Sequence, residues 1–508
     1  MNSKIHQLLL PLLGGFLFIQ LFFDEVMGIN TLLFTLFIIG SAWVIYPEII
    51  GRKTVRIALA SHLFTAIMVV AYGSIMAKVM YMISFAVLAG FMHQAALMHV
   101  LSAGVTAIQA WFKFPRLFIY TIVLHLPDIK ALAFHKWWYW MRITVVPLVC
   151  LAVFMWIYSA ANPVFASGLA YVTEDALRGF IWILESLSFS KIFFFCLGTW
   201  IVGWVLLKSQ LGMLLDIEIQ NPENIIRKRG NNRRDIPTMQ RQFYPVFPMN
   251  ALKNEFRSAA TLLIMVNVLL LVVNAIDIIW IWVGFEYKAG MDLSLFVHEG
   301  TWLLIASIFL SMGILIYYFR KNLNFIKENP RLKLLAKAWI IQNFILAISV
   351  GVRNYHYIAH FGLAYKRLGV IVFLILTIAG LYSMYYKIEH RKSFAYLLRV
   401  NGWNTFLILI CCTAINWDTM IANYNLKYSP VLDRGFLLRE LSDKTAPILH
   451  QHKDKMVYNL DDPSLNERYN NMLADKIDNL KSDVGNRSWL SWNFADWQAY
   501  QYFTENDK

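Results

Sequence analysis

Cysteine is scarce in this sequence, which has only four in 508 residues. None of them belongs to a C-x-x-C pair, so the sequence excludes the dithiol motif of redox proteins and the cysteine pairs of zinc fingers. All four lie in or at the ends of apolar runs, as Cys150, Cys196, Cys411 and Cys412. We interpret them as small core side chains, and we expect no metal site and no cofactor.

The sequence also lacks the short motifs of common soluble enzymes. It contains no Walker loop, no H-E-x-x-H, no G-x-S-x-G and no dinucleotide fingerprint. An enzyme that acts on lipid-linked substrates would need paired carboxylates or a metal cluster at the membrane face. Only His298 beside Glu299 offers material for such chemistry. We therefore assign no catalytic residue and favour a protein that is not an enzyme.

Charged residues make up only 15% of the chain, while 58% of the residues are hydrophobic and the mean hydropathy is +0.50. A soluble globular chain has about 25% charged residues, so this composition predicts an integral membrane protein. The net charge of +14 does not indicate a nucleic-acid partner. Lys and Arg cluster beside the apolar runs, as expected of cytoplasmic flanks. The expected partner is the lipid bilayer.

Long apolar runs recur along the chain, and each is long enough for a helix that crosses a ~30 Å hydrocarbon core. Residues 57–112 are nearly continuous apolar sequence, and loop parity favours two spans there, followed by an interfacial or re-entrant helix near 99–112. We predict an all-α polytopic bundle of about eleven spans, with twelve as the alternative. The predicted spans are 7–23, 29–46, 57–77, 79–98, 142–161, 191–207, 258–283, 300–319, 334–352, 368–386 and 402–419.

The spans imply a division of the chain into regions. Because the basic flanks mark the cytoplasmic side, the N-terminus is expected in the cytoplasm, and an odd number of spans places the C-terminus outside. The regions are N-terminal transmembrane helices 1–112, a cytoplasmic or interfacial loop 113–141, transmembrane helices 142–207, a basic cytoplasmic loop 208–257, a C-terminal transmembrane core 258–419, and a small soluble extracytoplasmic domain 420–508.

Two predicted spans carry polar stripes. Asn267, Asn274 and Asp277 lie within an arc of about 80° on one helix. On another, a spacing of eleven residues brings Gln342 over Arg353 and Asn343 over Asn354. Polar side chains inside a membrane either bind neighbouring helices together or mark a functional site, and both interpretations stay open here.

The stretch 353–367 is unusual because it brings Arg353, Lys366 and Arg367 to the outer side, where cations are scarce. One hypothesis is that they pair with Asp277, Glu299 and acidic groups of the C-terminal domain, and so close a polar vestibule. The other is that they bind lipid phosphate, with neighbouring tyrosines as interface anchors.

Several short stretches form a recognisable pattern. They are Leu252 to Phe256, Asn267 to Leu271 with Asn274 and Asp277, Phe319 to Phe325, Trp339 with Gln342 and Asn343, Arg353 with Asn354, Tyr365 to Gly369, and Ile421 to Asn425. This pattern resembles a family of bacterial, notably Bacteroidota-type, multi-pass membrane proteins known as a domain of unknown function in the DUF4153 and DUF4173 group. The resemblance covers about residues 250–430, with a short match around Gly90 to His99 in the N-terminal half, and implies a bacterial inner-membrane location without an activity.

These observations favour a non-enzymatic inner-membrane protein with a binding, sensing or scaffold role in the cell envelope. Its outer vestibule and periplasmic C-terminal domain would bind a protein partner or a small ligand. A permease that uses Asn274, Asp277 and Arg353 is the first alternative. A membrane-embedded enzyme acting on a lipid-linked substrate is the second.

Overall fold

The structure is a computed structural model. It describes residues 2–125, 143–144, 147, 151, 154–155, 158, 189–209, 212–225, 248–284, 293–320, 322–326, 329–457 and 463–506. These residues form helices and no strand, which confirms the all-α class. Seven of their helices are long and apolar enough to cross a membrane. The chain is therefore a multi-pass membrane protein, while the number of eleven spans stays a prediction.

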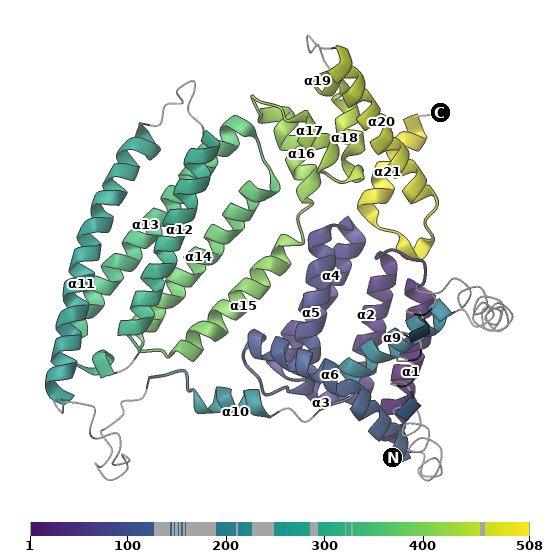
Figure 1. Ribbon diagram of the computed structural model, residues 1–508, viewed down its shortest axis with the longest axis horizontal. Helices are drawn as coiled ribbons and strands as arrows, with labels where there is room; N and C mark the ends of the chain where they lie inside the picture. Colours follow the sequence, from purple (N-terminus) through teal and green to yellow (C-terminus); the bar gives the residue numbers. More distant parts are fainter. Residues whose placement is uncertain are drawn as a thin grey trace.

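Six helices form an N-terminal bundle, drawn in purple to blue in Figure 1. The pair α4 and α5 is joined by a tight turn in which Gly73 has φ +56 and the Ser74 side chain accepts a hydrogen bond from the Ala77 N–H. Phe34, Ile38 and Phe91 lie in the buried core. The helices are α1 (Asn2–Phe22), α2 (Ile29–Ile45), α4 (Lys53–Tyr72), α5 (Ile75–His93), α6 (Val100–His125) and α9 (Phe189–Leu206), with the short α3 (Pro47–Ile50) between α2 and α4.

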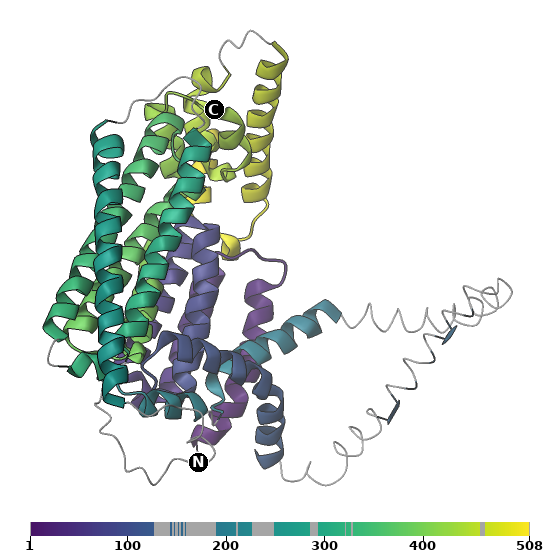
Figure 2. The same ribbon diagram turned by 60° about the vertical axis from the view of Figure 1, so that its left-hand side comes forward.

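A C-terminal bundle stands beside it, drawn in teal to green (Figures 1 and 2). Its central helix is α13, which packs against α11, α12 and α14. Buried Trp339, Leu346 and Val350 of α13 belong to the core of this bundle. The elements are α11 (Pro248–Asp277), which continues as the π-helix η3 (Ile278–Val283), then α12 (Leu293–Tyr318), η4 (Asn322–Phe325), α13 (Asn329–Phe361), α14 (Tyr365–Glu389) and α15 (Phe394–Cys412).

The two bundles are linked at the end near the N-terminus by a segment that contains α10 (Met213–Gln220). Glu218 accepts a hydrogen bond from the Met98 N–H at 2.8 Å, on the N-terminal bundle. Glu223 forms an ion pair with Arg399 of α15, on the C-terminal bundle. The acidic side chains of this segment therefore hold both bundles from the same side.

The remaining helices form a tail, residues 417–506, at the opposite end from the N-terminus (Figure 1). Its Asn425 side chain pairs with the backbone of Leu363, between α13 and α14. Its Trp492 O accepts a hydrogen bond from the Ile29 N–H of α2 at 3.1 Å. The elements are α16 (Trp417–Tyr428), α17 (Arg434–Arg439), η5 (Asp443–Thr445), α18 (Ala446–Gln451), α19 (Lys453–Val457), α20 (Pro463–Gly485), η6 (Trp489–Ser491) and α21 (Phe494–Asn506).

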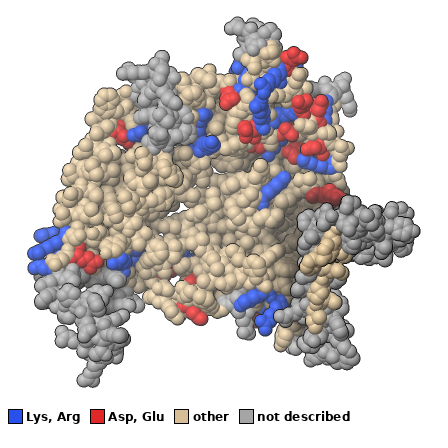
Figure 3. All heavy atoms as spheres, viewed as in Figure 1, with Lys and Arg blue, Asp and Glu red and all other residues tan. Residues whose placement is uncertain are grey.

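Charge separates these parts into layers. On the face shown in Figure 3, acidic and basic residues gather over the tail and at the opposite edge, and the band between them carries little charge. An apolar band flanked by charge is the surface expected of a protein surrounded by lipid. The band covers the helices of the two bundles.

Some predicted boundaries are wrong. The span predicted at 402–419 is α15, which begins at Phe394 and ends at Cys412, because Arg399 is accommodated by its ion pair with Glu223. The helix α13 extends nine residues beyond the predicted end at 352, so the polar stretch from Arg353 to Phe361 is helical. The helix predicted near 99–112 runs on to His125. Most of the predicted span 142–161 lies outside the described residues.

The contact between the tail and α2 leaves no room for a side chain at Gly28. A Cβ there would lie 2.5 Å from the carbonyl carbon of Ser491 and 2.6 Å from Trp492 O. We expect Gly28→Ala to cost about 1–3 kcal/mol by overpacking and to make the tail more sensitive to protease. The control is Gly40→Ala, where a Cβ meets nothing within 4 Å. Thermal unfolding and limited proteolysis in detergent measure both effects. If the two variants had the same stability and the same protease sensitivity, the contact between the tail and α2 would be contradicted.

Candidate functional site

The two predicted polar stripes face each other along α11 and α13. Gln342 Nε2 donates to Asn267 Oδ1 at 2.8 Å. Asn274 Nδ2 donates to Gln342 O at 3.1 Å. Nearest the tail, Arg353 Nη2 lies 2.7 Å from Asp277 Oδ1, a contact that agrees with the first of the two hypotheses for Arg353. We call these five side chains the seam.

The seam is shielded from lipid. Asp277 is 4% exposed and Asn274 is 3% exposed, whereas Val268, Leu269 and Val272 on α11 are exposed. Three buried acceptor atoms of the seam, Asn274 Oδ1, Asp277 Oδ2 and Gln342 Oε1, have no hydrogen bond to the described part of the chain. The seam therefore combines one ion pair with spare acceptors in a low-dielectric environment.

The other predicted site residues lie apart from the seam. Asn343 donates to Trp339 O within α13, and Asn354 donates to Arg367 O across to α14. Arg367 donates to the carbonyls of Phe361 and Gly362 and lies over the ring of Tyr357. It thus closes the turn between α13 and α14. Lys366 is exposed. His298 and Glu299 lie in the first turns of α12, but their side chains fall outside the described residues.

The ion pair of the seam makes a testable prediction. Removal of one partner leaves a buried charge, so Asp277→Ala and Arg353→Ala should each cost about 3–5 kcal/mol. The double variant should cost less than the sum of the two losses, by about 1–3 kcal/mol. The free energy of unfolding in detergent, measured for the unsubstituted protein, the two single variants and the double variant, completes this double-mutant cycle. A parallel cycle of Asp277→Ala with exposed Lys366→Ala should be additive, and an additive result for Asp277 with Arg353 would refute their coupling.

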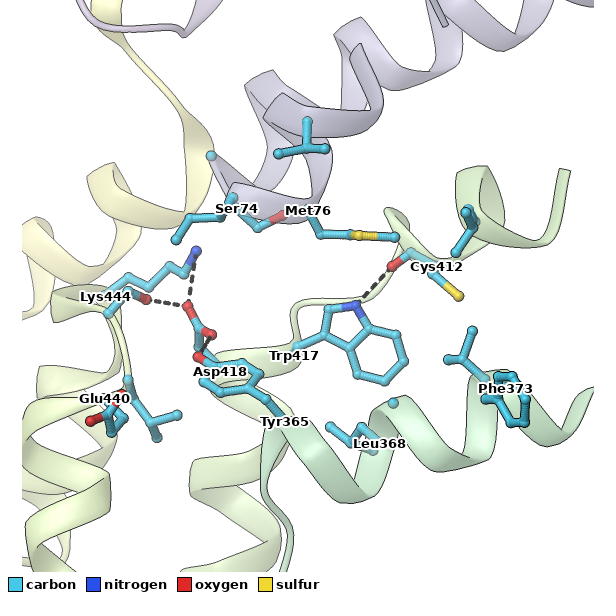
Figure 4. A pocket seen from close by; sticks show the side chains of 18 of the residues that line it. Ser74, Met76, Tyr365, Leu368, Phe373, Cys412, Trp417, Asp418, Glu440 and Lys444 are labelled. Atoms are coloured by element: carbon cyan, nitrogen blue, oxygen red, sulfur yellow. Dashed lines mark hydrogen bonds and ion pairs between the residues drawn. The ribbon is translucent and has the colours of Figure 1, made fainter. Parts of the chain in front are cut away.

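A cavity of about 880 Å³ lies where the two bundles and the tail meet. Its walls come from the turn between α4 and α5, from α14 and from the end of α15, and the tail covers its outer end (Figure 4). Its volume falls within the range of about 300–1,000 Å³ that is usual for ligand sites. The apolar residues of its wall are Ile75, Met76, Val79, Leu368, Val372, Phe373, Leu376, Leu409, Cys412, Trp417 and Leu441.

Polar groups gather at the tail end of the cavity around Asp418. Tyr365 and Ser442 both donate hydrogen bonds to this carboxylate. Lys444 Nζ lies 3.3 Å from Asp418 Oδ2 and donates to Tyr72 O, the last residue of α4, at 2.9 Å. Figure 4 shows Tyr365, Asp418 and Lys444 on one side of the cavity and Phe373 on the other. The cavity is therefore amphipathic, with a charged end under the tail and apolar walls between the two bundles.

The surroundings of Asp418 change its ionisation. Burial alone would raise the pKa of this carboxyl, but the hydrogen bonds from Ser442 and Tyr365 and the charge of Lys444 lower the pKa below its ordinary value of 3.8. A carboxylate with a lowered pKa in the folded state stabilises the fold above its ordinary pKa. That contribution disappears as the pH falls through the lower, folded-state pKa.

The pH dependence of stability tests this network. We expect Asp418→Asn to lose about 1.5–3 kcal/mol at pH 7, the contribution of hydrogen bonds to a charged group. The difference from the unsubstituted protein should shrink as the pH is lowered from 5 through 3.8 and below, because the carboxyl of the unfolded chain is protonated first and Asp418 of the folded chain only at its lower pKa. Thermal unfolding across this pH range measures it. Asp475→Asn, at an exposed position of α20, is the control. A difference that stays constant with pH would refute the role of Asp418.

Sequence reasoning did not find the cavity. Asp418 falls at the end of the predicted span 402–419, and Ser442 and Lys444 lie in the predicted soluble domain, where charges are ordinary. Tyr365 is one of the tyrosines expected as interface anchors. Trp417 stands directly before Asp418, and this aromatic–acid pair at the end of an apolar run was the one local signal available. The Trp417 Nε1 donates to Cys412 O and so fixes the connection from α15 to the tail.

The comparisons with known proteins place the chain in a family. No curated protein and no solved structure matches it. A family model described as "Domain of unknown function (DUF4153)" matches residues 32–452, which include the N-terminal bundle without α1, the C-terminal bundle, and the tail up to α18. The match confirms the resemblance to this domain of unknown function and extends it over most of the N-terminal bundle. The chain belongs to the DUF4153 family.

Proposed function

We propose that this protein binds one amphipathic molecule of the membrane in the cavity between its two bundles, without catalysing a reaction on it. The observation that carries the proposal is the polarity of the cavity. Apolar side chains of α14 line it from Leu368 to Leu376, and the charged group around Asp418 lies at the tail end. From Tyr365 to Leu376 this wall is about 16 Å long. An amphiphile would place its chains along this wall and its polar group under the tail.

The tail supports a sensing or scaffold role for this binding. It contacts both bundles and forms the outer end of the cavity, so an occupant would touch the part of the protein that extends furthest from the membrane. We infer a bacterial inner-membrane location, with the tail in the periplasm. Arg52 precedes α4, and Lys53 and Arg56 lie in its first turn, at the end away from the tail, as expected of a cytoplasmic side. A protein partner would then reach the tail from the periplasm.

A permease is the second candidate, and the spare acceptors of the seam favour it. Buried polar atoms without partners are rare in folded proteins, and inside membranes they often mark transport paths. Against this, Asp277 is held by Arg353, and the cavity described above does not include the seam. Amphiphile binding therefore has the stronger geometric support.

Filling the cavity tests the proposed function. Gly369 lines the cavity, and a Cβ there meets nothing within 4 Å, so Gly369→Phe places a ring in open space without a backbone clash. We expect it to weaken binding at least about tenfold, since each excluded CH₂ removes about 0.8 kcal/mol. Phospholipid retained per protein after detergent purification, counted by native mass spectrometry, gives the result.

The matched control is Gly313→Phe on α12, which is also exposed and meets nothing within 4 Å but does not line the cavity. It should retain lipid like the unsubstituted protein. Equal retention by the two variants, or no retained amphiphile in the unsubstituted protein, would overturn the proposal.

A further inference from the structure

The charged residues that line the cavity are balanced in sign. Asp418 and Glu440 contribute two carboxylates, and Arg439 and Lys444 contribute two cations. All four lie at the tail end, where a polar headgroup would be placed if the proposed function is correct. A cavity with a balanced set of charges does not attract an anionic or a cationic ligand by net charge alone.

One carboxylate and one cation of this set, Asp418 and Lys444, are already paired with each other. Asp418 receives hydrogen bonds from Tyr365 and Ser442 and faces Lys444, which also donates to Tyr72 O. Asp418 and Lys444 therefore satisfy each other, and their role is to hold the tail on the bundles.

The other pair is available to a ligand. Arg439 is the last residue of α17 and Glu440 follows it, and both are exposed at the rim of the cavity. Neither side chain forms a hydrogen bond or an ion pair with the described part of the chain. One guanidinium and one carboxylate, on consecutive residues, thus line the rim of an apolar cavity.

We propose that the cavity selects a zwitterionic phospholipid whose headgroup joins a phosphate to a primary amine, the phosphoethanolamine class. The proposal rests on the proposed function, because it names the class of amphiphile. Arg439 would bind the phosphate, since a guanidinium fork matches phosphate oxygens in a bidentate way. Glu440 would accept hydrogen bonds from the ammonium group.

The two neighbouring charges also act against other headgroups. A phosphoglycerol headgroup carries the same phosphate without a cation, so Glu440 would face net negative charge. A phosphocholine headgroup has no N–H to donate, so the charge of Glu440 would meet a cation that forms no hydrogen bond. Discrimination thus depends on Glu440, and affinity for every phospholipid depends on Arg439.

The experiment uses delipidated full-length protein and three phospholipids with identical acyl chains and phosphoethanolamine, phosphocholine or phosphoglycerol headgroups. Native mass spectrometry measures the binding of each lipid. We expect the phosphoethanolamine lipid to bind at least about tenfold more tightly than the other two. Arg439→Gln should weaken all three, whereas Glu440→Gln should remove most of the preference and raise phosphoglycerol binding.

Two exposed charges of the tail outside the cavity serve as controls. Lys453→Gln and Glu467→Gln should leave affinity and preference unchanged. Equal binding of the three lipids, or a preference that survives Glu440→Gln, would overturn the headgroup assignment. If Gly369→Phe still abolished binding in that case, the proposed function would stand. No binding of any of the three lipids would overturn both proposals.

Discussion

The ion pair between Lys444 and Asp418 joins the three parts of the molecule at one point. Both residues belong to the tail. Lys444 donates to the last carbonyl of α4 in the N-terminal bundle, and Asp418 accepts a hydrogen bond from Tyr365 of α14 in the C-terminal bundle. The Lys444 side chain is only 4% exposed. A buried ammonium that loses its partners is costly, so these contacts specify one position of the tail over both bundles. Because these contacts hold the tail in place, the tail covers the outer end of the cavity.

The boundary between the bundles differs at its two ends. Away from the tail, Trp403 of α15 stacks on Phe91 of α5 with ring centroids 5.7 Å apart, and its Nε1 donates to Met98 O. Near the tail, the same boundary widens into the cavity between α14 and the turn after α4. The contact between Trp403 and Phe91 at one end and the tail at the other end fix the width of the cavity. Neither depends on an occupant, so the site is preformed, which lowers the entropy that binding costs.

The sequence predicted the helical class and placed the polar residues of α11 and α13 in stripes, because both depend on local periodicity. Apolar length identified the helices, and spacing on a 3.6-residue turn placed Asn274 with Asp277 and Gln342 with Arg353. The cavity could not be predicted this way. Its residues come from segments between Gly73 and Lys444, and each is ordinary in its own segment. Arg367 shows the same limit, since only the turn geometry reveals that it serves the carbonyls of Phe361 and Gly362.

The two polar clusters solve different physical problems. The outer face of α11 is apolar, and lipid provides no hydrophobic drive that would press such a helix onto its neighbour. Side-chain hydrogen bonds and the ion pair between Asp277 and Arg353 set the register of α11 on α13 instead. A buried ion pair adds little net stability. It disfavours other registers of the two helices, because its charges would lose their partners there. The polar end of the cavity has exposed charges left over after its structural contacts are made, and a site with charges to spare is the one equipped to recognise a ligand.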